Sequence, residues 1–554
     1  MGSRPALSFA NKGNMPKAHS TPRASVARWA LGIAGLLSIF TAAACEGCHG
    51  GGQVQGKGPQ GEAALPTFRL YFVSNLAGAL EPCGCVKDQL GGIDHAAALI
   101  SKEKGQAKEA ALVSAGPLFF LSSDGDKAYR DQDKSKAETL ALTLKSLNLV
   151  AFAPGTNDVA SGAETLGKLH KASGASMLDL YAPEPSARHS VKQLGGVSVG
   201  FIGVGPKAPA DGPSLAERVK AEVAALKSEG AKVTVLLGSV GRGEAKRVAD
   251  FVPELTAIVV GEPQFSGEVN TEAPPGQLVG KTIIAETSNH LQTLGVLDFY
   301  VREGSYEFAD ASALSEGRRK AELMKHIAEV RGKIANYEQE GRGDKPEMAE
   351  KKADLQKSEA DLIAMENAPT PGKGSYFRYR LREVRTELGT DKGISEQLLA
   401  YYKRVNDENK RLYADRKPAV APKGSPSYVG IDTCSSCHQE ARKVWDKTAH
   451  AHAYKTLTDG FKEFNLDCVS CHVTGYDRPG GSTVTFVDKL KDVQCEVCHG
   501  PGSQHVENPK KTAIPVPHPT ADSCLACHHP PHVHSFDAPN KMANILGPGH
   551  GRSK

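Results

Sequence analysis

The sequence predicts a multidomain protein in which an α/β domain is followed by a helical hairpin and a mostly helical domain rich in cysteine and histidine. At 554 residues, the chain is too long for a single hydrophobic core. Short apolar runs alternate with helical segments in the first half, whereas eight of the 12 cysteines and 12 of the 19 histidines lie between Cys434 and His550. Such clustering indicates a metal or cofactor centre, because the alternative, a small disulfide-rich module, would not need the histidines.

The N-terminal segment 1–44 has the pattern of an export signal. Arg23 and Arg28 precede an uncharged run, 30–44, that is too short and too rich in small residues to predict a membrane span. Small residues before Cys45 suit a lipoprotein signal with lipidation of Cys45, and plain secretion or an uncleaved anchor are the alternatives. All three predict a periplasmic or outer-surface protein that meets a membrane only through such an anchor.

Residues 66–310, which follow a Gly-rich linker at 45–65, predict an α/β domain with its sheet covered on both faces. Buried strands are expected at the apolar runs Phe68–Val73, Ala111–Val113, Val197–Val204, Val233–Leu237 and Ala257–Val260. Helices are expected between them, for example at Gly92–Lys104 and Leu215–Ser228.

Residues 311–416 predict a long antiparallel helical hairpin and a return to the α/β domain. Apolar residues recur at helical spacing on both sides of a turn at 341–346, namely Leu323, Ile327, Val330 and Ile334, then Met348, Leu355 and Leu362. The charged faces are interpreted as solvated, with docking as the alternative. A strand at Tyr376–Leu381 and an amphipathic helix at Ile394–Leu412 lead to a linker at 417–427.

Four Cys-x-x-Cys-His motifs follow the linker. They are Cys434, Cys437 and His438; Cys468, Cys471 and His472; Cys495, Cys498 and His499; and Cys524, Cys527 and His528. Two thiols separated by two residues reach the two vinyl groups of one porphyrin, and the next residue supplies an imidazole to the iron. Half a zinc site or a redox dithiol would need no histidine at that position. The motifs therefore predict covalent haem attachment.

Eight further histidines in this region are candidate sixth ligands: His450, His452, His505, His518, His529, His532, His534 and His550. The domain has little apolar core besides porphyrin, so about half of them are expected to bind iron. Imidazole on both sides of iron gives a low-spin electron carrier, whereas a vacant side would permit substrate binding.

Residues 428–536 resemble the cytochrome c-554 family of tetrahaem cytochromes. Besides the motifs, the resemblance rests on Tyr428-Val429-Gly430, Trp445, the segment 448–453 and the segment 493–502 with His505. It implies a mostly α multihaem cytochrome c domain at 428–540, before a tail at 541–554, that carries four haem c groups and shuttles electrons. It implies His450 and His505 as sixth ligands, and leaves the others open among His518, His529, His532 and His534, of which His518 and His534 are the chosen candidates.

A fifth motif, Cys45-Glu46-Gly47-Cys48-His49, stands at the end of the signal. Lipidation of Cys45 would use the sulfur that haem attachment needs. Plain secretion would leave that sulfur available, so a fifth haem at this motif is the alternative to the four that we expect.

Residues 70–301 resemble the 5′-nucleotidase branch of the calcineurin-like metallophosphoesterases, which implies a metallophosphoesterase-like α/β sandwich. The match runs through the segments 72–82, 91–93, 113–117, 155–158 and 259–263. That family holds two metal ions that activate water for attack on a phosphate ester.

The metal ligands of that family are replaced in this sequence. Its Asp-x-His corresponds to Asn75-Leu76-Ala77, its Gly-Asp to Gly116-Pro117, and its Gly-Asn-His to Gly155-Thr156-Asn157. Its late histidines fall near Ser239 and Glu262. Amides, alanine and proline cannot replace charged ligands around two divalent ions. The domain is therefore expected to be a scaffold or a redox partner.

A cysteine pair, Cys83-Gly84-Cys85, lies in the loop after the first strand. It is either a structural disulfide or a redox-active thiol pair or soft-metal site.

Together these features predict an exported multihaem c-type cytochrome that is an electron carrier rather than an enzyme. The alternatives are a multihaem oxidoreductase for a small nitrogen or sulfur compound and a surviving metal-dependent phosphoesterase. Expected partners are redox proteins or quinol-linked donors and acceptors. The small formal charge of +4, with no basic patch, argues against nucleic acid.

Overall fold

The computed structural model describes residues 64–83, 89–123, 130–181, 186–206, 211–263, 269–339, 346–367, 369–529, 533 and 536–550. The chain divides into two units, 1–62 and 63–554, and all described residues belong to the second. The predictions for the export signal, Cys45, the fifth motif, Cys85, His532 and His534 lie outside the described residues. Within the described part of the chain, no helix is long and apolar enough to cross a membrane.

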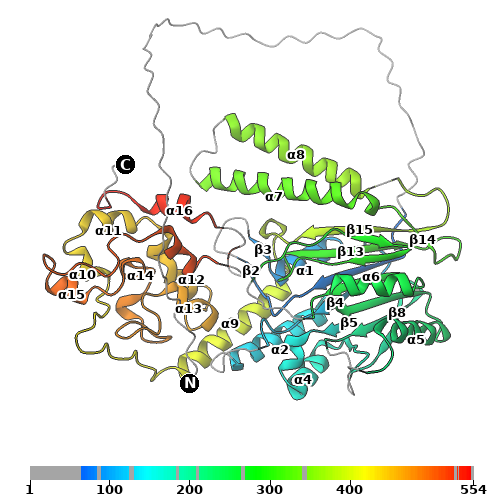
Figure 1. Cartoon of the computed structure of the whole chain (residues 1–554), viewed down its shortest axis with the longest axis horizontal. Helices are drawn as coiled ribbons and strands as arrows, with labels where there is room; N and C mark the ends of the chain where they lie inside the picture. The colour runs from blue at the N-terminus through cyan, green and yellow to red at the C-terminus, as the bar shows by residue number, and fades with distance from the viewer. Residues whose placement is uncertain are drawn as a thin grey trace, which may run out of the picture. The chain divides into compact units, whose positions relative to one another are not determined.

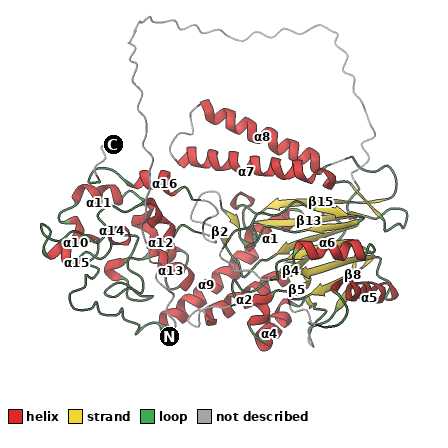
Figure 2. Ribbon diagram, in the orientation of Figure 1, coloured by secondary structure: helices red, strands yellow, loops and turns green. Residues whose placement is uncertain are grey.

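Two main β-sheets and a short hairpin form the α/β domain (Figure 2). The first sheet contains β1 (Phe68–Ser74), β4 (Ala110–Gly116), β5 (Leu149–Pro154), β6 (Ser176–Met177), β13 (Thr293–Tyr300), β14 (Phe308–Asp310) and β15 (Ser375–Glu383). The second contains β7 (His189–Leu194), β8 (Val197–Val204), β9 (Val233–Ser239), β10 (Ala257–Gly261), β11 (Gln277–Val279) and β12 (Thr282–Ala285). The short hairpin pairs β2 (Pro82–Cys83) with β3 (Leu90–Gly91).

The first sheet is parallel from β1 to β6 and antiparallel where β13 pairs with β1 and β15, whereas the second sheet is parallel at its centre and antiparallel at both edges. The first sheet has the order β14-β15-β13-β1-β4-β5-β6, with β1 parallel to β4 and antiparallel to β13. The second has the order β11-β12-β10-β9-β8-β7, with β8, β9, β10 and β12 parallel. Because parallel strands are linked by crossover helices, their carboxyl ends gather at one edge of each sheet.

The two sheets pack face to face and share an apolar core. Phe68, Leu70 and Phe72 of β1 lie in the same buried cluster as Phe201 of β8 and Val235 of β9. The expected sandwich is therefore present, and both faces of each sheet are covered. The inner face is covered by the other sheet, and helices cover only the outer face.

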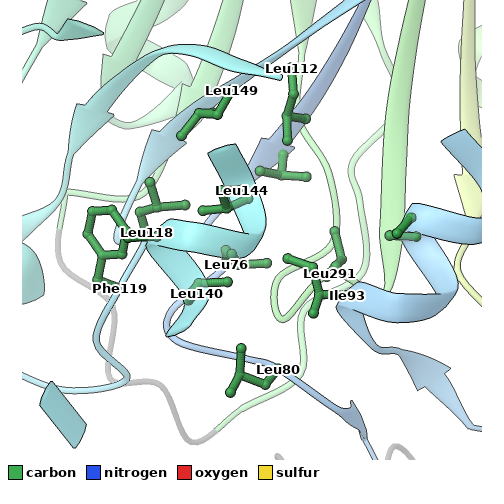
Figure 3. Packing of buried hydrophobic residues seen from close by; sticks show 14 of the residues in the cluster. Leu76, Leu80, Ile93, Leu112, Leu118, Phe119, Leu140, Leu144, Leu149 and Leu291 are labelled. Carbon is green, nitrogen blue, oxygen red and sulfur yellow. The ribbon is translucent and has the colours of Figure 1, made fainter. Parts of the chain in front are cut away.

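Helices cover the outer faces of the sandwich. They are α1 (Ile93–Lys102), α2 (Arg130–Ser146), α3 (Thr156–Ala160), α4 (Ala163–Ser173), α5 (Leu215–Ser228), α6 (Arg242–Phe251) and α9 (Lys392–Leu412). Figure 3 shows Leu140 and Leu144 of α2 pointing towards Leu112 and Leu149 of the first sheet, and α9 adds Leu398 and other residues to this cluster. Residues of α5 and α6, including Val219 and Val248, pack in a separate cluster with the second sheet.

The helical hairpin consists of α7 (Gly317–Gln339) and α8 (Pro346–Glu366) and follows the 3₁₀ turn η1 (Leu314–Glu316) (Figure 1). Ile327, Val330 and Met348 are buried, as their helical spacing predicts. Arg331 of α7 forms ion pairs with Glu359 of α8 and Glu383 of β15. After β15, the 3₁₀ turn η2 (Thr386–Leu388) leads to α9.

The C-terminal region is built from short helices and 3₁₀ turns. They are α10 (Ile431–Ser435), α11 (Gln439–Trp445), η3 (Ala449–His452), α12 (Ala453–Asp459), α13 (Leu466–His472), η4 (Asp488–Leu490), α14 (Cys495–His499), α15 (Ser503–Glu507), η5 (Ala521–Ala526) and α16 (Ala538–Ile545). Its apolar cluster is small: Tyr454, Val469, Val473 and Val487. Packing alone therefore provides little of the order of this region.

Asp158 fixes the loop after β4 and is completely buried. Its carboxylate accepts hydrogen bonds from the backbone N–H groups of Leu118 (2.8 Å), Phe119 (2.8 Å) and Gly155 (3.1 Å). Burial raises the pKa of Asp158 to about 6, although these three bonds oppose the shift. The carboxylate therefore has a structural role in this loop.

We expect Asp158→Ala to lower the free energy of unfolding by about 2–4 kcal/mol, because it leaves buried backbone N–H groups without acceptors. Guanidinium denaturation followed by circular dichroism measures the change. The exposed Asp250 of α6 provides the control, Asp250→Ala, which should stay near the wild-type value. Equal midpoints for the two variants would contradict this role.

Candidate functional site

The four Cys-x-x-Cys-His motifs lie on short helical turns. The first begins on α10, the second and third end α13 and α14, and the fourth lies at η5. The N–H of His438 donates to the carbonyl of Cys434 at 3.0 Å, and that of His528 donates to Cys524 at 2.9 Å. A helical turn brings positions three and four apart onto one side, so both thiols and the imidazole of a motif can face one porphyrin. All eight cysteines of the motifs are free thiols, as haem attachment requires and a disulfide module would not.

Three of the four motif histidines face a second imidazole. The ring centres are 6.4 Å apart for His438 and His505, 6.2 Å for His450 and His528, and 6.4 Å for His499 and His550. Two metal–imidazole bonds of about 2 Å each, together with the half-widths of the two rings, span roughly 6 Å. Each pair therefore fits one iron between its rings, and the residues present fit haem.

Backbone carbonyls orient several of these rings. The Nδ1 of His499 donates to Val516 at 2.9 Å, and that of His505 donates to Thr512 at 2.7 Å. With Nδ1 occupied, Nε2 is the nitrogen left for iron, and such a carbonyl contact fixes both tautomer and ring orientation. Burial lowers the pKa values of His450, His528 and His550, which favours the neutral imidazole that a metal needs.

His472 of the second motif has a different environment. Its Nδ1 lies 2.5 Å from the carbonyl oxygen of Ala453, so Nε2 is again free to bind iron. Among the described residues, however, no imidazole pair like the other three includes His472. The second motif therefore has a proximal ligand, without an imidazole seen opposite it.

The thiols place the four motifs next to one another in pairs. Cys434 of the first motif lies within hydrogen-bonding reach of Cys495 of the third, which raises the pKa of Cys434 and lowers that of Cys495. Cys471 of the second motif lies similarly beside Cys527 of the fourth, and this contact lowers the pKa of Cys471 to about 6. Burial raises the pKa of Cys498 in the third motif, with a smaller contribution from Cys524 of the fourth. The motifs are thus connected in the order first, third, fourth, second.

The second motif also contacts the α/β domain directly. Gln132 of α2, which is 5% exposed, accepts hydrogen bonds from the Leu466 N–H (3.0 Å) and the Asn409 side chain (2.8 Å). It donates to the Asn465 side chain at 3.2 Å. Asn409 of α9 donates in turn to the carbonyl of Phe464 at 2.9 Å. The start of α13 is therefore held by a buried amide network from α2 and α9.

Charged groups surround this network. Lys136 of α2 pairs with Asp467 of α13 at 3.1 Å. Lys462 pairs with Glu81, and its ammonium lies 4.3 Å from the centre of the Tyr402 ring. Burial raises the pKa of Asp133 to about 6, and the nearby Asp467 adds to the shift. These contacts anchor the second motif on the α/β domain at several independent points.

The residues at the positions of phosphoesterase ligands are engaged in hydrogen bonds with the protein. The Asn75 side chain accepts from the N–H of Glu262 at 2.8 Å. Asn157 donates to the carbonyls of Phe120 (3.0 Å) and Leu121 (2.9 Å). Among the described residues, no group of three or more His, Cys, Asp or Glu side chains could hold a metal ion.

The remaining candidates are placed as follows. His518 is exposed and has none of the ring pairings found for the other ligand candidates. The backbone of Cys83 lies in β2, paired with Leu90, but the placement of its side chain and of Cys85 lies outside the described part of the chain. The roles of His518, His534, Cys83 and Cys85 stay predictions.

Sequence reasoning named His550 as a candidate ligand but placed the segment that carries it outside the cytochrome domain. His550 lies in the segment 541–554 expected to follow the cytochrome domain, yet its ring faces that of His499. Gln132 and Asn409 were also not anticipated. Both lie on amphipathic helices where a polar residue on the outer face is normally solvated, so no local signal could have identified them.

The C-terminal region thus has four Cys-x-x-Cys-His motifs and three facing imidazole pairs. The model of the family "Cytochrome c554 and c-prime" matches residues 433–500. Cytochrome c-554 of Nitrosomonas europaea is 37% identical over 91 residues, which are 14% of this chain and 39% of that protein. The region resembles this family, and the family implies c-type haem.

Solved structures similar to the α/β domain are 5′-nucleotidases and related proteins. A 5′-nucleotidase precursor from Thermus thermophilus has 14% identity and a TM-score of 0.40, covering 74% of this chain and 69% of that chain. The sulfate thiohydrolase of Thermus thermophilus has 14% identity and a TM-score of 0.36, covering 44% and 55%. The calcineurin-like phosphoesterase of Bacillus subtilis has 16% identity and a TM-score of 0.34, covering 43% and 86%.

We expect Gln132→Ala to release the start of α13, because it removes the acceptor of the buried Leu466 N–H and a partner of Asn409 and Asn465. The loss corresponds to about 2–3 kcal/mol. Hydrogen–deuterium exchange of the peptide 466–472 should accelerate, while that of β1 should not. Gln106→Ala is the matched control, since Gln106 is exposed and has only a 3.5 Å contact with Lys102. Unchanged exchange in Gln132→Ala would contradict the anchoring role.

We expect the interface to lose stability as pH rises from about 4 to about 6. The pKa of Asp133 is raised from 3.8 to about 6 in the folded protein, so in this window the folded state holds more protons than the unfolded state. Asp133→Asn should remove this dependence and raise stability at pH 7 by about 1–2 kcal/mol. Thermal unfolding across pH 4–7 measures both effects. Parallel profiles for the variant and the wild type would contradict the assignment.

Proposed function

We propose that this chain is an exported multihaem c-type cytochrome that carries electrons, with the α/β domain as its scaffold. The observation that carries the proposal is the set of three imidazole pairs, each containing one motif histidine and spaced for one iron. Haem c, when bound, supplies reversible one-electron chemistry at its iron. The chain supplies four attachment sites. Imidazoles whose rings are oriented by backbone carbonyls would occupy the axial positions of the irons and close those sides to substrate.

The adjacency of the motifs supports electron transfer over the whole region. The thiol contacts link the first motif to the third, the third to the fourth and the fourth to the second. An electron entering at either end of this order can reach the other end through neighbouring sites. The second motif is the end that contacts α2 and α9, so the first motif is the end left for an external redox protein.

The α/β domain supports this function as a rigid base. Its amide network holds the residues that precede Cys468, and its ion pairs with Lys462 and Asp467 limit movement of the second motif. The former phosphoesterase positions are used for backbone hydrogen bonds, which disfavours the alternative of a surviving metal-dependent phosphoesterase. Export, a periplasmic or outer-surface location and a lipid anchor at Cys45 complete the proposal and rest on the sequence pattern at 1–45.

A second candidate function is favoured by one observation. His472 is a motif histidine without a facing imidazole among the described residues. An iron held only by His472 would keep one side open for a small nitrogen or sulfur compound, as a multihaem oxidoreductase requires. The spin state of haem at the second site distinguishes the two functions. An oxidoreductase requires an iron with one open side, which is high spin, whereas an electron carrier does not.

We expect His505→Ala, His450→Ala and His550→Ala each to convert one low-spin haem to high spin while all haem stays covalently attached. The reason is that each substitution removes an axial imidazole without touching a thioether or a motif histidine. Haem-to-protein stoichiometry and electron paramagnetic resonance of the oxidised protein measure both properties.

The control for this series is His326→Ala, since His326 lies on α7 in an exposed ion pair with Asp354. Its spectrum should match that of the wild type. Four haems per chain, all low spin in the wild type, would support the carrier and reject the oxidoreductase. Absence of covalent haem would refute both.

A further inference from the structure

A cavity of about 920 Å³ lies between the helical hairpin and the first sheet. One wall is a face of α7, and the other is formed by β15 with the segment 271–276. The cavity exists because small residues line the α7 wall, including Ala321, Ala328 and Gly332. They recur at helical spacing on one face and are too short to reach the sheet. The apolar residues Ile327 and Val330 of α7 are buried, so the small residues form a separate face.

Most of the cavity surface is apolar, although charged side chains such as Glu272 and Arg385 also line it, and the wall contains a polar hydroxyl without a partner among the described residues. Tyr379 of β15 is 1% exposed, and its hydroxyl has no hydrogen-bond partner among the described residues. Lys320, also on the wall, is 5% exposed and pairs with Glu366 at 2.9 Å. A buried phenol hydroxyl without a partner costs free energy, and a ligand oxygen in the cavity would remove that cost. A mostly apolar pocket with few polar groups is typical of small-molecule sites.

The cavity also reaches the fourth haem motif. Phe536, Asp537 and Lys541 contribute to its wall. The Phe536 ring stacks on the ring of His528, with centres 4.2 Å apart and planes inclined by 7°. His528 is the motif histidine of the fourth site. One aromatic side chain therefore contacts both the cavity and an iron ligand.

We propose that this cavity binds a quinol or quinone and connects it to the fourth haem site. This inference rests on the proposed electron-carrier function and names the small-molecule partner and its place. A quinone ring is flat and apolar, which suits the wall of small aliphatic residues, and its oxygens suit the Tyr379 hydroxyl and the Lys320 ammonium. A nucleoside monophosphate fits less well, because the buried ammonium of Lys320 is already neutralised by Glu366.

The electron and proton balance of the reaction is complete. A quinol loses two O–H hydrogens as two protons and two electrons and becomes the quinone. With haem attached at the motifs, the two electrons would reduce two ferric irons, one electron each. The two protons leave to water at the open side of the cavity, where Lys325 and Lys333 of its wall are exposed. The reverse direction balances in the same way.

Equilibrium dialysis of the full chain with a short-tailed benzoquinone tests the inference without using turnover. We expect saturable binding by the wild type. Tyr379→Phe should weaken it about tenfold, because one hydrogen bond is lost. Ala328→Phe should abolish it by filling the cavity. The control is Ala353→Phe on the exposed surface of α8, which should bind as the wild type does. Because the buried Tyr379 hydroxyl has no partner among the described residues, its removal should not lower the thermal unfolding temperature.

The outcomes separate this inference from the proposed function. Haem that accepts electrons from a small inorganic reductant, together with no benzoquinone binding or equal affinity in Tyr379→Phe, would overturn the inference alone. Binding of adenosine monophosphate in place of benzoquinone would do the same. Weaker binding in Tyr379→Phe and loss of binding in Ala328→Phe, with wild-type binding in Ala353→Phe, support the site.

Discussion

The order of the C-terminal region depends on imidazole pairing across the chain. Its apolar cluster contains only Tyr454, Val469, Val473 and Val487 among the described residues, which is too little to hold a region of this length in one conformation. Each facing pair joins segments that are distant in sequence, as His438 and His505 do. An iron bound between two such rings acts as a cross-link, and the free energy of binding becomes folding free energy. Haem binding and folding are therefore one process in this region.

The same constraint explains why the second motif is anchored on the α/β domain. In the described part of the chain the other three motif histidines each face a second imidazole, and the second motif is the one in contact with α2 and α9. Gln132 and Asn409 supply buried hydrogen bonds to residues immediately before Cys468. The sheet sandwich, with its large shared core, can hold those helices rigidly. The α/β domain, which has a large apolar core, thus stabilises the C-terminal region, which has only a small one.

Features encoded in short segments of the sequence could be predicted, whereas contacts between distant segments could not. The strands Val197–Val204 and Val233–Ser239 and the two helices of the hairpin depend on short runs of residues, and they were predicted within a few positions. The packing of two sheets against each other came from the family resemblance, since alternation alone does not distinguish one sheet from two. The pairing of His550 with His499 could not be predicted, because it depends on the path of the tail in space. The hydrogen bonds of Gln132 could not be predicted for the same reason, because they join segments that are distant in sequence.

The hydrogen bonds at the strand ends and the anchoring of the second motif are connected by one physical argument. A two-metal centre needs several uncompensated oxygen and nitrogen ligands at the carboxyl ends of the strands, and these are costly to bury without the ions. In this chain the Asn75 and Asn157 side chains bond to nearby backbone, so the strand ends are satisfied without metal. A sandwich with satisfied strand ends no longer depends on a bound ion for its order. It can then serve as a permanent base, on which the second motif, through Gln132, Lys136 and Glu81, is held in place.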